Sequence, residues 1–307
     1  MYRRFGGVDV LSMGRIPRAT PGPLSVLVRP VAVSLNPVDV QIREGLERKY
    51  LTPRFPAVPG IDVAGVVVEL GADTPEFAID DAVVGHAMKD FVGAGTLAEF
   101  VDMPVRSTIR IPEGLTFREA ATLPLAAQTA LQVIRRSELQ AADRVLVSGA
   151  AGGVGSFAVQ LAKRTGAVVV GTASHKNLTY VEDLGAMAID YRSDLQEATR
   201  AIAPHGFDVV LDLVGGPALD NALTVMAKDG RVTSIADSRA RDQFGGQFVW
   251  LRPSTADLRT VAELAASREL RTDIGGVYRF DQFRSAFDAF EARETRGKTI
   301  IEFGGTT

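Results

Sequence analysis

The chain has no cysteine and only three histidines, His86, His175 and His205, among its 307 residues. The absence of cysteine excludes disulfides, thiolate nucleophiles and cysteine-ligated zinc or iron–sulfur sites. The histidines lie far apart in the sequence and form no H-x-x-x-H pair, so a histidine-rich metal site has little support. We therefore expect no metal in this protein.

Long runs of one residue type are also missing. No apolar segment reaches the roughly 18 residues of a membrane-spanning helix, and residues 1–7 lack the apolar stretch of a signal peptide. The 34 basic and 37 acidic residues are mixed along the chain, without a basic block that would follow a phosphate backbone. We expect a soluble cytoplasmic protein that binds neither membrane nor nucleic acid.

The first part of the chain predicts a small, irregular β domain. Its short apolar runs, at 24–33, 63–70 and 82–85, are separated by frequent prolines that disfavour long helices. The rhythm changes near residue 115, where Thr116 and Glu119 have the spacing of a helix capping box.

Strand and helix patterns alternate over residues 116–273. This alternation predicts a doubly wound parallel sheet, because each crossover helix covers a face of the sheet. The apolar run at 298–303 has no partner in that pattern, and we expect it to return to the first domain. The predicted domains are therefore 1–115 with 274–307, and 116–273.

A glycine-rich turn, Ser148 to Gly155, lies between a predicted strand at 144–148 and a predicted helix at 153–165. Its core, Ala150-Ala151-Gly152-Gly153-Val154-Gly155, matches the dinucleotide fingerprint G-x-G-x-x-G except for alanine at the first glycine. The helix N-terminus attracts a pyrophosphate, Gly152 allows close backbone approach, and Gly155 allows helix and strand to pack. The alternative is a tight turn that binds no dinucleotide.

The end of the second strand of this domain decides which nicotinamide cofactor binds. An NAD enzyme places Asp or Glu there, but the strand at 167–173 ends without an acid. Ser174, Lys176 and Tyr191 can instead donate hydrogen bonds and positive charge to a 2′-phosphate. We therefore expect NADPH. The alternative is that Lys176 is solvated and Tyr191 packs against a helix.

Several motifs, in their order, resemble the medium-chain dehydrogenase/reductase superfamily, in its zinc-independent quinone oxidoreductase (zeta-crystallin-like) branch. They are Ser34-Leu35-Asn36-Pro37-Val38-Asp39, Pro59-Gly60-Ile61-Asp62-Val63-Ala64-Gly65, Gly95-Thr96-Leu97-Ala98-Glu99-Phe100, the glycine-rich turn, Leu184-Gly185-Ala186, Asp212-Leu213-Val214-Gly215-Gly216 and Arg296-Gly297-Lys298. The match runs through nearly the whole chain.

The resemblance implies an α/β protein with a Rossmann domain at 116–273 and a GroES-like catalytic domain at 1–115 and 274–307. In that family the cleft between the domains holds the nicotinamide, and the protein is a homodimer. Zinc-dependent relatives place ligands at positions that here look like Asn36 and 60–62, so the zinc site is missing.

The resemblance also assigns residues. Asn36 and Asp39 would lie near the nicotinamide and substrate as the catalytic pair, and Thr129 would contact the nicotinamide nucleotide. The cofactor would also be bound, together with Ser174, Lys176 and Tyr191, by Ala151, Gly152, Gly153, Val154 and Val214. The alternative for Asn36 and Asp39 is an Asx-type turn before Pro37.

The expected activity is hydride transfer from NADPH to a quinone or an α,β-unsaturated carbonyl, because we expect no metal that could activate an alcohol. A non-catalytic NADPH-binding protein and an enoyl reductase of carrier-bound acyl chains remain alternatives. Phe91, Phe244 and Trp250 are candidates for an apolar acceptor pocket. Arg43 and Tyr50 are candidates for its polar lining, although charged loop residues are more often solvated.

Overall fold

The computed structural model describes residues 1–51, 53–87, 92–293 and 295–304. The chain forms two compact units, unit 1 from Met1–Leu125 and Pro253–Thr307, and unit 2 from Ala126–Arg252. The sequence rhythm suggested divisions near 115 and 273 instead. Residues 116–125 group with unit 1 because their helix packs on strands of that unit, and a helical pattern alone does not reveal which sheet a helix covers.

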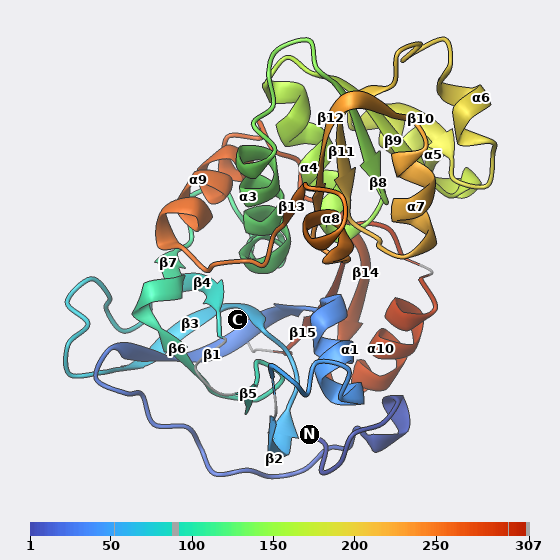
Figure 1. Ribbon diagram of the computed structural model, residues 1–307. Helices are drawn as coiled ribbons and strands as arrows, with labels where there is room; N and C mark the ends of the chain where they lie inside the picture. Colours follow the sequence, from blue (N-terminus) through green and yellow to red (C-terminus); the bar gives the residue numbers. More distant parts are fainter. Residues whose placement is uncertain (52, 88–91, 294, 305–307) are drawn as a thin grey trace. The chain divides into compact units, whose positions relative to one another are not determined.

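The secondary structure of each unit follows the chain order (Figure 1). Unit 1 contains η1 (Val8–Val10), β1 (Ser25–Ser34), α1 (Pro37–Glu44), β2 (Pro53–Val58), β3 (Asp62–Leu70), β4 (Ala82–His86), β5 (Val92–Ala94), β6 (Val101–Pro104), η2 (Val105–Ser107), β7 (Thr108–Arg110), α2 (Phe117–Ala121), α9 (Thr255–Ala266), β14 (Ile274–Arg279), η5 (Phe280–Gln282), α10 (Phe283–Glu291) and β15 (Lys298–Glu302). The π-helix η3 (Leu123–Ala127) leads from unit 1 into unit 2.

Unit 2 contains α3 (Gln128–Arg136), β8 (Arg144–Ser148), α4 (Gly153–Arg164), β9 (Val168–Ala173), η4 (His175–Asn177), α5 (Leu178–Asp183), β10 (Met187–Asp190), α6 (Leu195–Thr199), β11 (Phe207–Asp212), α7 (Pro217–Leu223), β12 (Met226–Ser234), α8 (Arg239–Asp242) and β13 (Gln247–Phe248). Helices α4 and α9 have 12 residues each. In the described part of the chain, no helix has the length and apolar character needed to cross a membrane.

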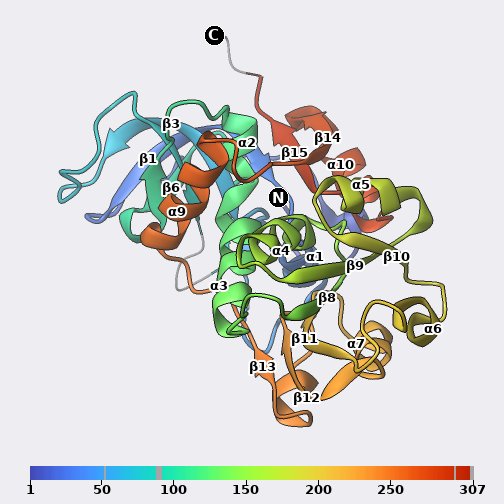
Figure 2. The same cartoon turned by 90° about the horizontal axis from the view of Figure 1, so that it is seen from above.

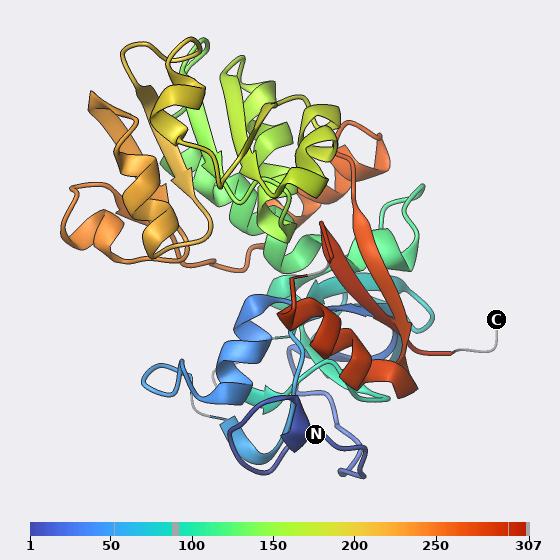
Figure 3. The same cartoon turned by 90° about the vertical axis from the view of Figure 1, so that its right-hand side faces the viewer.

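The sheet of unit 1 has the order β14-β15-β1-β3-β4-β7, with β6 also paired to β1. Strand β15 pairs antiparallel with β1, which confirms the predicted return of the C-terminal strand. Its second neighbour, the parallel strand β14, was not predicted. Helix α10 packs on β14 and β15 (Figure 3), and Phe287 of this helix joins a core that includes Val33 and Ile301.

Helix α1 was also not predicted, because the prolines of the first 60 residues disfavoured helices. Pro37 is the first helical residue, where its fixed φ suits the helix and its missing N–H would have no helical partner. The proline therefore begins this helix, and Gly45 ends it with a left-handed φ of 78°.

The sheet of unit 2 is parallel, in the order β10-β9-β8-β11-β12-β13. By chain order this is the 3-2-1-4-5-6 arrangement of dinucleotide-binding folds. Right-handed crossovers then place α4 and α5 on one face and α7 on the other, as seen in Figure 2. The order of the strands along the chain reverses between β8 and β11, which is the position where such sheets bind ligands.

Candidate active site

The glycine-rich turn of unit 2 connects β8 to α4 and is held by the neighbouring strand. Ala150 N–H donates to the Thr172 carbonyl at 3.0 Å, and Gly149 N–H donates to Thr172 Oγ1 at 3.3 Å. Gly149 has a left-handed φ of 76°, and a Cβ on Gly155 would lie 2.1 Å from the Gly149 carbonyl oxygen. The turn therefore requires glycine at both positions.

The surroundings of this turn fit the pyrophosphate of a dinucleotide. Gly152 is the N-cap of α4, and no side chain of the described residues caps this helix end. Its N–H groups and dipole are therefore available to an anion. At the adjacent strand end, Asp212 accepts hydrogen bonds from the N–H groups of Val214 at 3.2 Å and Gly215 at 2.9 Å, which fixes the second glycine-containing loop.

Three other predicted cofactor residues lie at the carboxyl ends of β9 and β10. Tyr191 N–H donates to the Ala173 carbonyl at 3.0 Å, so Tyr191 and Ser174 lie next to each other. Lys176 follows in η4 and is exposed. Asp190, at the end of β10, accepts a hydrogen bond from Arg192 N–H at 3.0 Å and lies 3.8 Å from His175 Nδ1. This carboxylate at the edge thus already has partners.

Thr129, on α3, is the last predicted cofactor residue. It is buried, and its Oγ1 has no hydrogen-bond partner among the described residues. A buried hydroxyl without a partner is unfavourable unless a ligand or water satisfies it. This observation suits a residue that binds a polar group of a cofactor.

The predicted catalytic pair lies in unit 1, inside a cluster of buried polar side chains that we call the acid cluster: Ser34, Asn36, Asp39, Asp62 and Lys298. Asn36 N–H donates to Asp39 Oδ2 at 2.8 Å, which caps α1. Asn36 Nδ2 donates to Asp62 Oδ2 at 2.9 Å, and Ser34 Oγ donates to the same oxygen at 3.0 Å.

Lys298 brings the positive charge into the acid cluster from β15. Its Nζ donates to the Leu35 carbonyl at 2.9 Å and to Asn36 Oδ1, and it lies 3.9 Å from Asp62 Oδ2. Asn36 therefore connects Lys298, Asp62 and Asp39 in one network. Asn36 is the N-cap of α1 and Asp39 its third helical residue, so both residues also have the local structural role that was the alternative interpretation.

Burial changes the acidity of these groups. Burial first, and then the charge of Asp62, raise the pKa of Asp39 to about 7, against the opposing effects of the Asn36 N–H, the Lys298 charge and the Gly60 N–H. Burial also raises the pKa of Asp62 and lowers that of Lys298. Asp39 is 3% exposed, and its Oδ1 has no hydrogen-bond partner among the described residues. It can therefore hold an exchangeable proton near neutral pH.

Arg43 is not solvated, contrary to the prediction for a charged loop residue. Its side chain is 0% exposed and donates to both carboxylate oxygens of Glu291 on α10, at 2.7 and 3.1 Å. Its Nε donates to the Gly6 carbonyl at 3.0 Å. The sequence did not reveal this burial, because the helix α1 that places Arg43 on a buried face was not predicted. Arg43 fastens α1 to α10 and to the N-terminal segment.

The other candidate lining residues lie in varied places. Tyr50 is 74% exposed, and Phe244 and Trp250 are also exposed in unit 2. Phe91 lies outside the described residues. None of the described three is part of the acid cluster.

Sequence reasoning missed Ser34, Asp62 and Lys298 as partners of Asn36 and Asp39. A signal was present, because Asp62 and Lys298 are charged residues at the starts of apolar strands. A charge in such a run is costly to bury unless it is paired. The sequence alone does not tell which distant charge supplies the partner.

Zinc does not fit the acid cluster. No group of three or more potential metal ligands was found when the described residues were searched. At the positions that resemble those of zinc ligands in relatives, Asn36 accepts a hydrogen bond from Lys298, whose ammonium group also lies near Asp62. A divalent cation there would be repelled by this ammonium group.

The fold and the two sites define a class: a dinucleotide-binding unit joined to a unit with buried acid–base groups, as in dehydrogenases and reductases. Comparison with known families agrees. Residues 22–113 match the alcohol dehydrogenase GroES-like domain, and residues 184–301 match a family described as zinc-binding dehydrogenase.

Individual relatives narrow the class. The chain is 35% identical to the chloroplast envelope quinone oxidoreductase homolog of Arabidopsis thaliana, over 97% of this chain and 95% of the relative. It is 33% identical to the chloroplastic NADPH-dependent alkenal/one oxidoreductase of that plant, over 98% of this chain and 78% of the relative. The structure of the quinone oxidoreductase from Coxiella burnetii matches with a TM-score of 0.87 and 30% identity, over 98% and 97%.

The chain belongs to the medium-chain dehydrogenase/reductase superfamily, in its zinc-independent quinone oxidoreductase branch. It is an oxidoreductase of that family.

Proposed function

We propose that the protein is a zinc-independent, NADPH-dependent reductase of quinones or α,β-unsaturated carbonyls. The observation that carries this proposal is the acid cluster: Asn36 and Asp62 lie at positions that resemble those of zinc ligands in relatives, and the Lys298 ammonium group lies beside both. Without a Lewis acid, alcohol oxidation loses several kcal/mol of transition-state stabilisation. An acceptor that is already electrophilic needs only a hydride and a proton.

NADPH, when bound, supplies the hydride. We infer that Ala151, Gly152, Gly153 and Val154 hold its pyrophosphate, with Val214 and Thr129 contacting the nucleotide on the nicotinamide side. Ser174, Lys176 and Tyr191 would hold the 2′-phosphate. The absence of an acid at the end of β9 and the name of the NADPH-dependent alkenal/one relative support this choice over NADH.

Asp39 would supply the proton. Reduction of a quinone or an enone leaves an oxyanion or enolate, and a carboxyl group with a pKa of about 7 is protonated often enough to neutralise it. Asn36 would orient this carboxyl group through its N–H. The proton goes to the reduced acceptor, and Asp39 becomes a carboxylate that solvent must protonate again.

The test is turnover by the purified protein after treatment with a chelator. We expect NADPH oxidation with members of a panel of quinones and enones, and a higher KM for NADH than for NADPH. A requirement for added zinc would contradict the proposal. Tight NADPH binding without hydride transfer to any acceptor would favour the non-catalytic alternative, and activity confined to carrier-bound acyl chains would favour the enoyl reductase alternative.

We also propose a cytoplasmic homodimer. The family expectation supports the dimer. Sedimentation analysis of the purified protein tests the assembly.

A further inference from the structure

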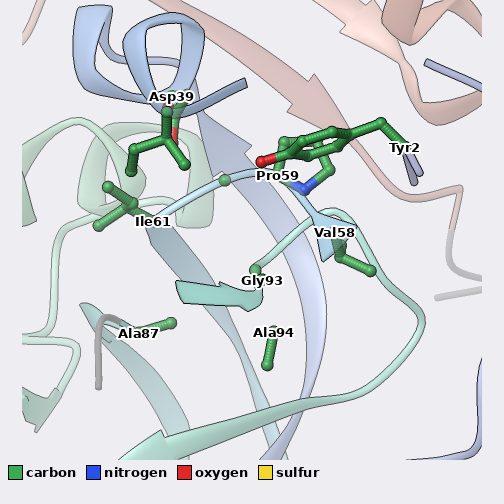
Figure 4. Close-up of a pocket in the computed structure, with 11 residues that line it drawn as sticks. Tyr2, Asp39, Val58, Pro59, Ile61, Ala87, Gly93 and Ala94 are labelled. Atoms are coloured by element: carbon green, nitrogen blue, oxygen red, sulfur yellow. The ribbon is translucent and has the colours of Figure 1, made fainter. Parts of the chain in front are cut away.

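A small cavity in unit 1 connects Asp39 with the protein surface. Its lining includes Tyr2, Asp39, Gly60, Gly93 and Ala94 (Figure 4). The space open to the centre of a water molecule is about 30 Å³, and about 10–15 Å³ by that measure holds one water. The cavity is therefore large enough for water and too small for a quinone.

The two ends of the cavity differ in exposure. At the inner end Asp39 is buried, and its Oδ1 has no hydrogen-bond partner among the described residues. At the outer end Ala94 is exposed. A buried carboxyl group thus lines a water-sized space that reaches the solvent.

Tyr2 supplies a second polar group to the cavity. Its backbone is held by Ala57, because the N–H of each residue donates to the carbonyl of the other at 2.8 Å. Its ring, 1% exposed, lies along Pro59 with the hydroxyl on the side that faces Asp39 (Figure 4). The N-terminal segment therefore places a phenol hydroxyl in the cavity that Asp39 also lines.

The state of this hydroxyl suits a relay. Burial, and then the charge of Asp39, raise the pKa of Tyr2 to about 12, against the effect of Arg43. The phenol stays protonated, so it can accept one proton and donate another without a charged intermediate. The other charged groups that act on Asp39, Asp62 of β3 and Lys298 of β15, belong to the acid cluster and do not line the cavity.

We propose that this cavity is the proton-entry path to Asp39, with the Tyr2 hydroxyl and enclosed water as the relay. This proposal rests on the function proposed above. For each acceptor that is reduced, one proton enters from solvent. At the water and at the Tyr2 hydroxyl, one O–H bond forms while another O–H bond breaks. Asp39 thereby regains the proton that it gave to the acceptor. No electron moves along this path.

The experiment compares the first turnover with continuous turnover at about pH 6, where Asp39 starts protonated. Stopped-flow mixing of the NADPH complex with substoichiometric acceptor measures the first turnover. Tyr2→Phe keeps the ring and removes the relay oxygen. We expect its first turnover to match the wild type, and its kcat to fall about tenfold with a larger solvent deuterium isotope effect.

Two further variants keep the test decisive. Ala94→Leu narrows the outer end without removing a polar group. Like Tyr2→Phe, it should leave the first turnover unchanged and lower kcat. Tyr278→Phe removes a hydroxyl from β14, outside the cavity, and should change neither rate. Equal loss of both rates in Tyr2→Phe would indicate a structural role and overturn the proposal, and so would an unchanged kcat in both cavity variants.

Failure of the proton path is distinguishable from failure of the proposed function. If the wild type reduces no acceptor, the proposed function is wrong. If the wild type is active and Asp39→Asn loses turnover, but the two cavity variants keep the wild-type kcat, only the path is wrong.

Discussion

The glycine-rich turn of unit 2 and the acid cluster of unit 1 are built in opposite ways. The turn is one contiguous segment, and its backbone N–H groups do the binding. The acid cluster collects side chains from β1, α1, β3 and β15, which are up to 264 positions apart between Ser34 and Lys298. A site made of backbone N–H groups does not depend on the chemistry of its side chains, but a bulkier residue in the turn would block it. A cluster of charged side chains loses its charge balance when one member is removed.

The largest effect is expected from Lys298→Met. This change removes the cation and leaves the Asp62 carboxyl group buried without it, so we expect a loss of about 3–5 kcal/mol in the free energy of unfolding. Urea unfolding measures it. The double variant Lys298→Met/Asp62→Asn should recover part of the loss, because no unpaired charge remains. A single variant as stable as the wild type would mean that the acid cluster is not a coupled unit.

The second effect concerns Asp39→Asn, which keeps the shape of the side chain and removes the exchangeable proton. We expect kcat to fall about 100-fold, with unchanged NADPH affinity in a binding titration. In the wild type, kcat should fall as the pH rises through about 7, because the carboxyl group then loses its proton. If the variant keeps wild-type turnover, the proton comes from another group.

The same variant tests the pKa through stability. The folded-state pKa of Asp39, about 7, lies above the ordinary value of 3.8 for this side chain. The folded wild type therefore binds more protons than the unfolded chain between these values, and it loses stability as the pH rises from about 4 to about 7. Asp39→Asn lacks this loss. The difference between the melting temperature of the variant and that of the wild type should therefore increase as the pH rises from about 4 to about 7.

A third, smaller effect separates two glycines of the turn. Gly155→Ala would bring a Cβ to 2.1 Å from a backbone oxygen, and we expect a destabilisation of about 1–3 kcal/mol. Gly152→Ala brings its Cβ only to 3.3 Å from the nearest atom, so it should fold and lose mainly NADPH affinity. Gly22→Ala, with 3.7 Å to its nearest neighbour, is the control. Equal affinity losses without destabilisation in both turn variants would contradict the packing role of Gly155.

The smallest effect is expected from Lys176→Ala. It should weaken NADPH about tenfold and leave NADH affinity unchanged, because only NADPH carries a 2′-phosphate. Lys228→Ala, which removes an exposed lysine near the start of β12 in the same unit, should change neither affinity. Equal weakening of both cofactors by Lys176→Ala would remove this residue from the 2′-phosphate site.

The contrast between the two sites also explains what the sequence could predict. The strand at 144–148, the turn and the helix that follows were predicted because hydrophobic periodicity and glycine spacing are local signals. The return of β15 was predicted from an apolar run without a local partner. Asn36 and Asp39 were named only through a family resemblance.

The remaining features depend on contacts between distant segments. The burial of Arg43 depends on Glu291, and the position of Tyr2 depends on Ala57. Neither partner can be read from the residues around Arg43 or Tyr2, because pairing of this kind has no period and no fixed spacing. Helix α1 was missed for a different reason, since Pro37 was interpreted as a helix breaker rather than as a first helical residue.

Strand β15 has a consequence for the order in which the protein is made. The ribosome releases β1 and Asp62 early, but the strand that covers one side of β1 and carries Lys298 emerges only after the whole of unit 2. Because nascent domains fold as units, unit 2 can complete its sheet first. Until β15 emerges, the nascent unit 1 has an unpaired edge at β1, and an unpaired edge favours mispairing with other strands.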